Sequence, residues 1–70
     1  MAVKNKKKYA VVYRDGRYIR KAPNTFAEKI VTVKKGDEFI FLNEVINDWY
    51  KVKVNRKIGW IHSSTARIVE

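Results

Sequence analysis

The chain of 70 residues has no cysteine, one proline, one histidine and three glycines. The absence of cysteine excludes disulfide bonds and thiolate metal sites, so a domain of this size depends on its apolar core for stability. No stretch approaches the roughly 18 consecutive apolar residues of a transmembrane helix. The sequence also contains no glycine-rich phosphate loop, no paired carboxylates and no cluster with metal-ligand spacing. We therefore expect no enzyme activity, no cofactor and no metal site.

A periodicity of two residues dominates the sequence and indicates β-strands. Apolar residues make up 46% of the chain and aromatic residues 13%, which is enough for one small core. No window carries the sustained apolar stripe of an amphipathic helix. The predicted strands cover residues 9–14, 17–21, 29–33, 38–45, 49–54, 58–62 and 66–69. We predict an all-β fold over residues 9–70, a closed or nearly closed barrel of about five to seven short antiparallel strands.

Turn signals predict how these strands connect. Asp15-Gly16 lies between two β-prone runs and predicts a two-residue hairpin, because a type I′ turn needs positive φ at both positions. Asn47-Asp48 predicts another turn, and residues 63–65 predict a single 3₁₀ turn. Gly59 inside a strand predicts a bulge or a close approach of two backbones.

Positive charge is concentrated at the N-terminal end. The net charge is +9, and residues 1–23 hold eight basic residues against one acidic residue. Such a field attracts polyanions, although exposed basic residues also simply keep a chain soluble. Tyr9, Tyr13 and Tyr18 interleave with these charges, as aromatic residues do in barrels that bind single-stranded nucleic acid. The predicted basic patch comprises Lys6, Lys7 and Lys8 of a tail over residues 1–8, with Arg14, Arg17 and Arg20.

Four sequence blocks carry a resemblance to a known family. Residues 18–24, Tyr-Ile-Arg-Lys-Ala-Pro-Asn, resemble Leu-Asn-Val-Arg-x-Gly-Pro-Ser, with Ala22 for the glycine and Asn24 for the serine. Residues 34–39 are similar to Lys-Lys-Gly-Asp-x-Val, and residues 47–52 to Asn-Gly-Trp-Tyr-Lys-Val. Residues 59–64, Gly-Trp-Ile-His-Ser-Ser, are similar to Gly-Trp-Val-His-Ser-Ser. The chain thus resembles the bacterial Src-homology-3 (SH3b) family over residues 18–69.

The resemblance implies a small SH3-like barrel that acts as a noncatalytic targeting module, often beside peptidoglycan hydrolases, and binds wall peptides. Comparison with eukaryotic SH3 domains narrows the ligand class. Those domains have a proline and a tyrosine where this chain has His62 and Thr65, and they use both residues to bind polyproline. The replacements argue against a polyproline ligand.

Five residues are predicted to form a shallow ligand-binding rim. Trp49 alternates with Lys51 and Lys53, which mark a solvent face, so we predict that its indole is at least partly exposed. The competing interpretations are that Trp49 covers a barrel end, that Phe26 is a loop anchor packed on the core, and that His62 is structural. The predicted ligand-binding residues are Trp49, Phe26, Asn47, His62 and Tyr18.

These observations lead to two functional hypotheses. In the first, the chain recognises a cell-wall peptide or an anionic wall polymer. In the second, it is an intracellular barrel that binds nucleic acid or a protein partner through its basic N-terminal hairpin. Ile40 and Leu42 lie opposite the predicted core face, so they are either covered or form a partner surface; we expect a monomer. The absence of a signal peptide predicts a cytoplasmic location for the chain as written, or the cell envelope or exterior if it belongs to a larger protein.

Overall fold

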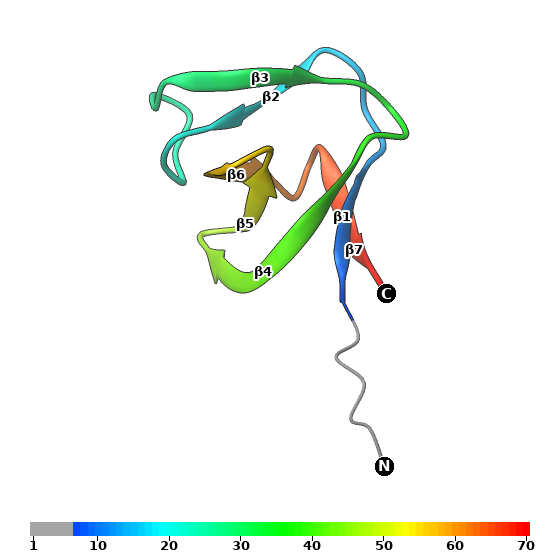
Figure 1. Cartoon of the computed structure of the whole chain (residues 1–70). Coiled ribbons are helices and arrows are strands. Elements are labelled where there is room, and N and C mark those ends of the chain that lie inside the picture. The colour runs from blue at the N-terminus through cyan, green and yellow to red at the C-terminus, as the bar shows by residue number, and fades with distance from the viewer. Residues whose placement is uncertain (1–6) are drawn as a thin grey trace.

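A computed structural model describes residues 7–70, which form seven antiparallel strands and no helix (Figure 1). The strands are β1 (Tyr9–Val12), β2 (Arg17–Arg20), β3 (Lys29–Val33), β4 (Glu38–Ile46), β5 (Trp49–Val54), β6 (Lys57–His62) and β7 (Ala66–Val69). Strands β3, β5 and β7 begin and end where the sequence predicts them. The all-β, SH3-like barrel is therefore confirmed. No helix within residues 7–70 has the length and apolar character needed to cross a membrane.

The seven strands form one sheet in the order β3-β2-β6-β5-β4-β1-β7. The sheet curls so that β2 and β3 lie above β5 and β6, while β1 and β7 lie side by side at the other end (Figure 1). This curl encloses the core. Its fully buried members come from most of the strands, and the largest are Ile19, Ile61, Val12, Val33 and Val52.

The predicted Asp15-Gly16 hairpin is wrong. Strand β1 pairs with β4 and β7, and β2 pairs with β3 and β6, so the two strands that flank Asp15-Gly16 do not pair with each other. Gly16 has a positive φ of 69°, but Asp15 does not, which rules out a type I′ turn. Instead the Asp15 carboxylate accepts a hydrogen bond from the backbone N–H of Lys35, 2.7 Å away. The segment thus fastens the Lys34–Asp37 turn.

The turn that does have hairpin geometry is Asn47-Asp48, between β4 and β5. Both residues have positive φ, 48° and 68°, as a type I′ turn requires. Asn43 in β4 also has a positive φ, 62°, where the register between β4 and β5 shifts. The extra residues of β4 form a β-bulge, which bends this strand across the base of the barrel.

Gly59 is a point of close backbone approach, as the sequence predicts. A Cβ atom at this position would overlap Cγ2 of Ile19 and would lie 3.3 Å from the backbone oxygen of Arg20. Only glycine therefore lets β6 lie this close to β2. The same contact brings His62, at the end of β6, near the residues of β2.

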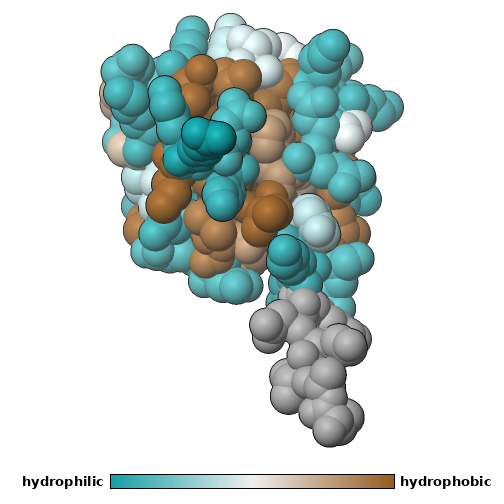
Figure 2. Space-filling model, in the orientation of Figure 1, coloured by the Kyte–Doolittle hydropathy of each residue, from teal (hydrophilic) through white to brown (hydrophobic). Residues whose placement is uncertain are grey.

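Residues 63–65 form a single turn in which the N–H of Thr65 donates to the oxygen of His62, 2.9 Å away. No 3₁₀ helix extends from it. Ile40 and Leu42 are half-buried, and β1 pairs alongside Ile40. Figure 2 shows apolar side chains reaching the surface between hydrophilic ones on the face in view.

Candidate binding groove

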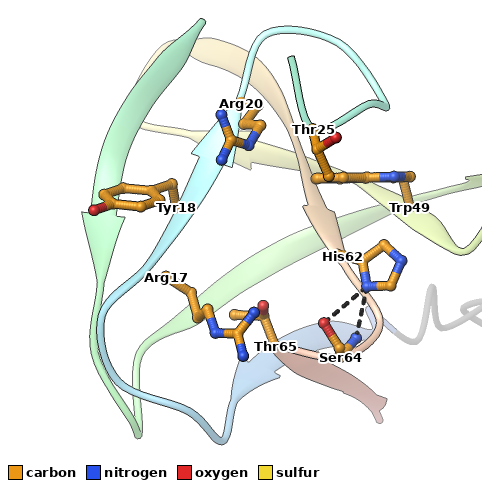
Figure 3. A pocket seen from close by; sticks show the side chains of 8 residues that line it. All are labelled: Arg17, Tyr18, Arg20, Thr25, Trp49, His62, Ser64 and Thr65. Atoms are coloured by element: carbon orange, nitrogen blue, oxygen red, sulfur yellow. Dashed lines mark hydrogen bonds between the residues drawn. The ribbon is translucent and has the colours of Figure 1, made fainter. Parts of the chain in front are cut away.

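An open pocket of about 210 Å³ lies between β2, the loop after it, the start of β5 and the end of β6. Figure 3 shows the side chains around it. Its lining residues are Arg17, Tyr18, Arg20, Thr25, Trp49, His62, Ser64 and Thr65. Three of the five predicted ligand-binding residues, Tyr18, Trp49 and His62, are therefore brought together.

The sheet register explains why these side chains share one face. Trp49 is paired with His62, and Trp60 is paired with Lys51 on one side and Arg20 on the other. Residues that are directly opposite, or two apart along a strand, project to the same side of a sheet. The outer face of β2, β6 and β5 therefore carries aromatic and basic side chains together. The inner face of the same strands carries Ile19 and Ile61, which are in the core.

The prediction that Trp49 is partly exposed is wrong. The residue projects from the face that bears Lys51 and Lys53, as predicted, but only 6% of its surface is accessible. The loop of residues 21–28 lies against this face, and Thr25 stands beside the indole in Figure 3. The His62 ring packs on it from the neighbouring strand, with a centroid separation of 5.0 Å and an interplanar angle of 73°. Trp49 is thus a wall of the pocket.

Phe26 has the opposite outcome, because 97% of its surface is exposed. The interpretation of Phe26 as a loop anchor packed on the core is therefore wrong. Its backbone N–H donates to Oδ1 of Asn24, 2.9 Å away, and this local turn directs the chain outward. Phe26 follows Thr25 at the edge of the pocket but does not line it.

Asn47 also lies outside the pocket lining. Its positive φ and exposed position mark it as a turn residue of the β4–β5 hairpin. The neighbouring Asp48 accepts a hydrogen bond at its backbone oxygen from the N–H of Ser63, 2.9 Å away. The turn is therefore joined by this hydrogen bond to the segment that carries Ser64, and a ligand-binding role of Asn47 stays a prediction.

His62 closes the turn that forms the far side of the pocket. Its Nδ1 accepts a hydrogen bond from the backbone N–H of Ser64 at 3.0 Å and lies 2.9 Å from Ser64 Oγ. A neutral ring with this acceptor carries its proton on Nε2. This arrangement resembles a side-chain cap of a turn. A nucleophile–base pair would need a third group that orients the imidazole, and within residues 7–70 no carboxylate is bonded to it.

Two arginines give the pocket its charge, and no acidic residue lines it. Arg20 is held in place: its Nη1 donates to the backbone oxygen of Ala27, 3.0 Å away, and its guanidinium lies 5.7 Å from the centre of the Tyr18 ring. Arg17 is exposed and reaches toward Thr65 along the opposite side of the pocket (Figure 3). The sequence assigned both to a basic patch without placing them in the groove.

The predicted basic patch is not continuous. Arg17 and Arg20 belong to β2, whereas Lys7 and Lys8 precede β1 at the far end of the fold (Figure 1). Arg14 precedes β2 and does not line the pocket; its guanidinium lies 5.8 Å from the centre of the Tyr13 ring. Lys6 is outside the described residues. The patch divides because the hairpin that would have united it does not form.

Two of the three tyrosines that interleave with these charges, Tyr13 and Tyr18, are already in contact with cations. Arg14 and Arg67 lie 5.8 and 5.4 Å from the centre of the Tyr13 ring. Lys29 Nζ lies 4.1 Å from the centre of the Tyr18 ring, in addition to Arg20. Rings engaged in this way leave less open surface on which a nucleobase can stack.

Three lining residues carry no signal strong enough to predict from the sequence. Ser64 is the last residue of the block similar to the family motif, and Thr65 follows it directly; the block identifies the segment without giving the direction of either side chain. Thr25 lies in a loop whose sequence shows neither strand alternation nor a recognisable turn motif at this position. Within residues 7–70, no group of three His, Asp or Glu side chains comes together in a way that could hold a metal ion.

Comparison with known proteins agrees with this architecture. No curated protein sequence matches the chain significantly. The family profile described as bacterial SH3 domain matches residues 10–66, which include all but the ends of the barrel and every residue of the pocket. The chain therefore belongs to the bacterial SH3 domain family, whose members are generally noncatalytic binding modules.

Proposed function

We propose that this protein is a noncatalytic binding module that recognises a cell-wall peptide in the groove beside Trp49. The observation that carries the proposal is the convergence of Tyr18, Trp49 and His62, from three different strands, on one pocket. Rigid strands hold all three, so the groove exists before a ligand arrives. A preformed site loses less conformational entropy on binding.

The size and lining of the groove suit a short peptide segment. Pockets that enclose a drug-sized ligand measure about 300–1,000 Å³, so a pocket of about 210 Å³ holds only one end or one or two side chains of its ligand. Trp49 and Tyr18 contribute apolar atoms to the lining, and the arginines offer hydrogen-bond donors. Such a mixture fits a peptide better than a purely apolar or purely charged ligand.

The hypothesis of nucleic-acid binding has less support. It depended on a continuous basic hairpin with open tyrosine rings. Within residues 7–70 that hairpin is absent, the basic residues are divided, and Tyr13 and Tyr18 are engaged by cations. An anionic wall polymer would also need a continuous row of basic residues, which the divided basic patch does not offer. This favours a peptide as the ligand of the groove.

Binding to purified peptidoglycan sacculi tests the proposal. We expect Tyr18→Ala to reduce the retained fraction at least fivefold, because the ring lines the groove. Tyr9→Ala is the matched control, because Tyr9 is also half-buried but lies in β1, outside the groove. Trp49→Ala is less suitable, since removing a buried indole also lowers stability. Urea denaturation of both variants establishes that each is folded.

Equal retention of wild type and Tyr18→Ala would contradict the proposal. A parallel titration with a short single-stranded oligonucleotide at two salt concentrations tests the nucleic-acid hypothesis. Salt-sensitive binding of the oligonucleotide together with no retention on sacculi would replace the wall peptide by nucleic acid.

A further inference from the structure

We propose that the peptide ligand is anchored by a carboxylate that binds the guanidinium of Arg17. The inference rests on the proposed function, because it names the chemical group that the same groove recognises. It begins from the charge of the pocket, which has two arginines and no acidic residue in its lining.

Arg17 is available for a ligand. The two ion pairs found within residues 7–70 are Lys21–Glu28 and Lys51–Glu44, and neither includes Arg17. No hydrogen bond of its guanidinium to another described residue is present either. An arginine carries five N–H donors in a planar fork that matches both oxygens of a carboxylate. The unpaired guanidinium of Arg17 can therefore donate two parallel hydrogen bonds to a carboxylate that enters the pocket.

Arg20 has a different role. Its Nη1 is bonded to the backbone oxygen of Ala27, and its plane lies near Tyr18. It positions the loop that covers Trp49 and adds positive charge on the side of the pocket opposite Arg17 (Figure 3). Its charge strengthens the field in the groove without making it the anchor.

The geometry favours a carboxylate over the phosphates of a polymer. A phosphodiester chain would need several cations spaced along a track. Here one free guanidinium stands at a small pocket whose lining includes the rings of Tyr18, Trp49 and His62. A carboxylate at the end of a peptide places its charge on the fork and its last small side chain against the rings.

Two forms of one peptide test the proposal by titration calorimetry. The first is a wall stem pentapeptide with free carboxylates, and the second is the same peptide with every carboxylate converted to an amide. We expect wild type to bind the acid at least tenfold more tightly than the amide, because only the acid can accept a charged, bidentate pair of hydrogen bonds.

Variants of Arg17 locate the anchor. Arg17→Ala should lower the affinity for the acid to that for the amide, and Arg17→Lys should recover only part of it, because lysine keeps the charge but lacks the fork. Arg14→Ala is the matched control: it removes the same side chain from a site beside Tyr13, outside the groove, and should preserve the preference for the acid.

The outcomes separate the two proposals. Equal affinity of wild type for acid and amide would overturn the carboxylate anchor and leave peptide binding intact. A preference for the acid that persists in Arg17→Ala would also overturn it, because the anchor would be another residue. If neither form binds at millimolar concentration, the proposed function itself fails.

Discussion

The imidazole of His62 meets the indole of Trp49 nearly edge to face, with ring centroids 5.0 Å apart. The two residues are directly opposite each other on β5 and β6. Trp49 is therefore buried on the outer face of the sheet, where its neighbours Lys51 and Lys53 are not. One residue thus contributes both to the stability of the domain and to the wall of its groove.

The first prediction contrasts this tryptophan with the exposed Phe26. We expect Trp49→Ala to lower the free energy of unfolding by about 3 kcal/mol or more, because it empties a buried aromatic site. Phe26→Ala should change it by no more than about 0.5 kcal/mol, because the ring is 97% exposed. Urea denaturation measures both. If Trp49→Ala does not fold, Trp49→Phe is measured in its place. A loss of unfolding free energy in Phe26→Ala as large as that in the Trp49 variant would contradict the burial of the two side chains.

The second prediction concerns the approach of β6 to β2. Gly59→Ala should lower the free energy of unfolding by about 1–3 kcal/mol, because the added Cβ would overlap Cγ2 of Ile19. The double variant with Ile19→Leu, which removes that branch, should lose less than the sum of the two single variants. Strict additivity in urea denaturation would show that the two residues do not make this contact.

The third prediction concerns the β4–β5 turn. Asp48 has a φ of 68°, a region that glycine adopts with no steric cost. Asp48→Gly should therefore raise the free energy of unfolding by roughly 0.5–1 kcal/mol, and Asp48→Ala should lower it. The pair is informative because both variants remove the carboxylate, and only the backbone preference differs. A loss of stability in the glycine variant measured by thermal denaturation would contradict the turn geometry.

Much of the fold follows from local sequence patterns. The alternation of apolar and polar residues predicts the bounds of β3, β5 and β7 correctly. Asn47-Asp48 predicts a turn because few other residues adopt a positive φ, and Gly59 predicts a close backbone approach because only glycine lacks a Cβ atom. The Asp15-Gly16 signal is wrong because a distant partner decides its conformation. The N–H of Lys35 holds the Asp15 carboxylate, and β1 has two other strands to pair with.

The site is predictable only in part, for a related reason. Alternation correctly places Trp49 on the outer face but cannot show that the loop of residues 21–28 covers it. The same applies to Arg20, whose charge is evident in the sequence, whereas its place in the groove depends on the pairing of β2 with β6. Arg17 lines the groove from the start of β2, together with Ser64 and Thr65 of the 63–65 turn, and local sequence does not show that these segments meet. The packing of a loop over a side chain and the order of strands in a sheet both depend on residues far apart in the chain, so local patterns in one sequence do not predict them.

The last prediction concerns the support of the groove by Tyr13. Its hydroxyl donates to the backbone oxygen of Ser63, 2.6 Å away, and its N–H donates to that of Thr65, 2.8 Å away. These bonds fix the 63–65 turn against β1. Tyr13→Phe should lower the free energy of unfolding by about 1 kcal/mol, because it leaves a partly buried carbonyl without its partner.

Tyr9→Phe is the control for this change, because the Tyr9 hydroxyl makes no hydrogen bond to another described residue. We expect it to change the free energy of unfolding by no more than about 0.5 kcal/mol. Hydrogen exchange gives a second readout. The amide of Thr65 donates to His62 within the turn, so it should exchange faster in Tyr13→Phe than in wild type, while the amides of the β5–β6 ladder should shift only with global stability. If the Thr65 amide instead keeps its protection relative to that ladder, the turn holds its shape without Tyr13, and the groove wall formed by His62 and Ser64 is independent of this hydrogen bond.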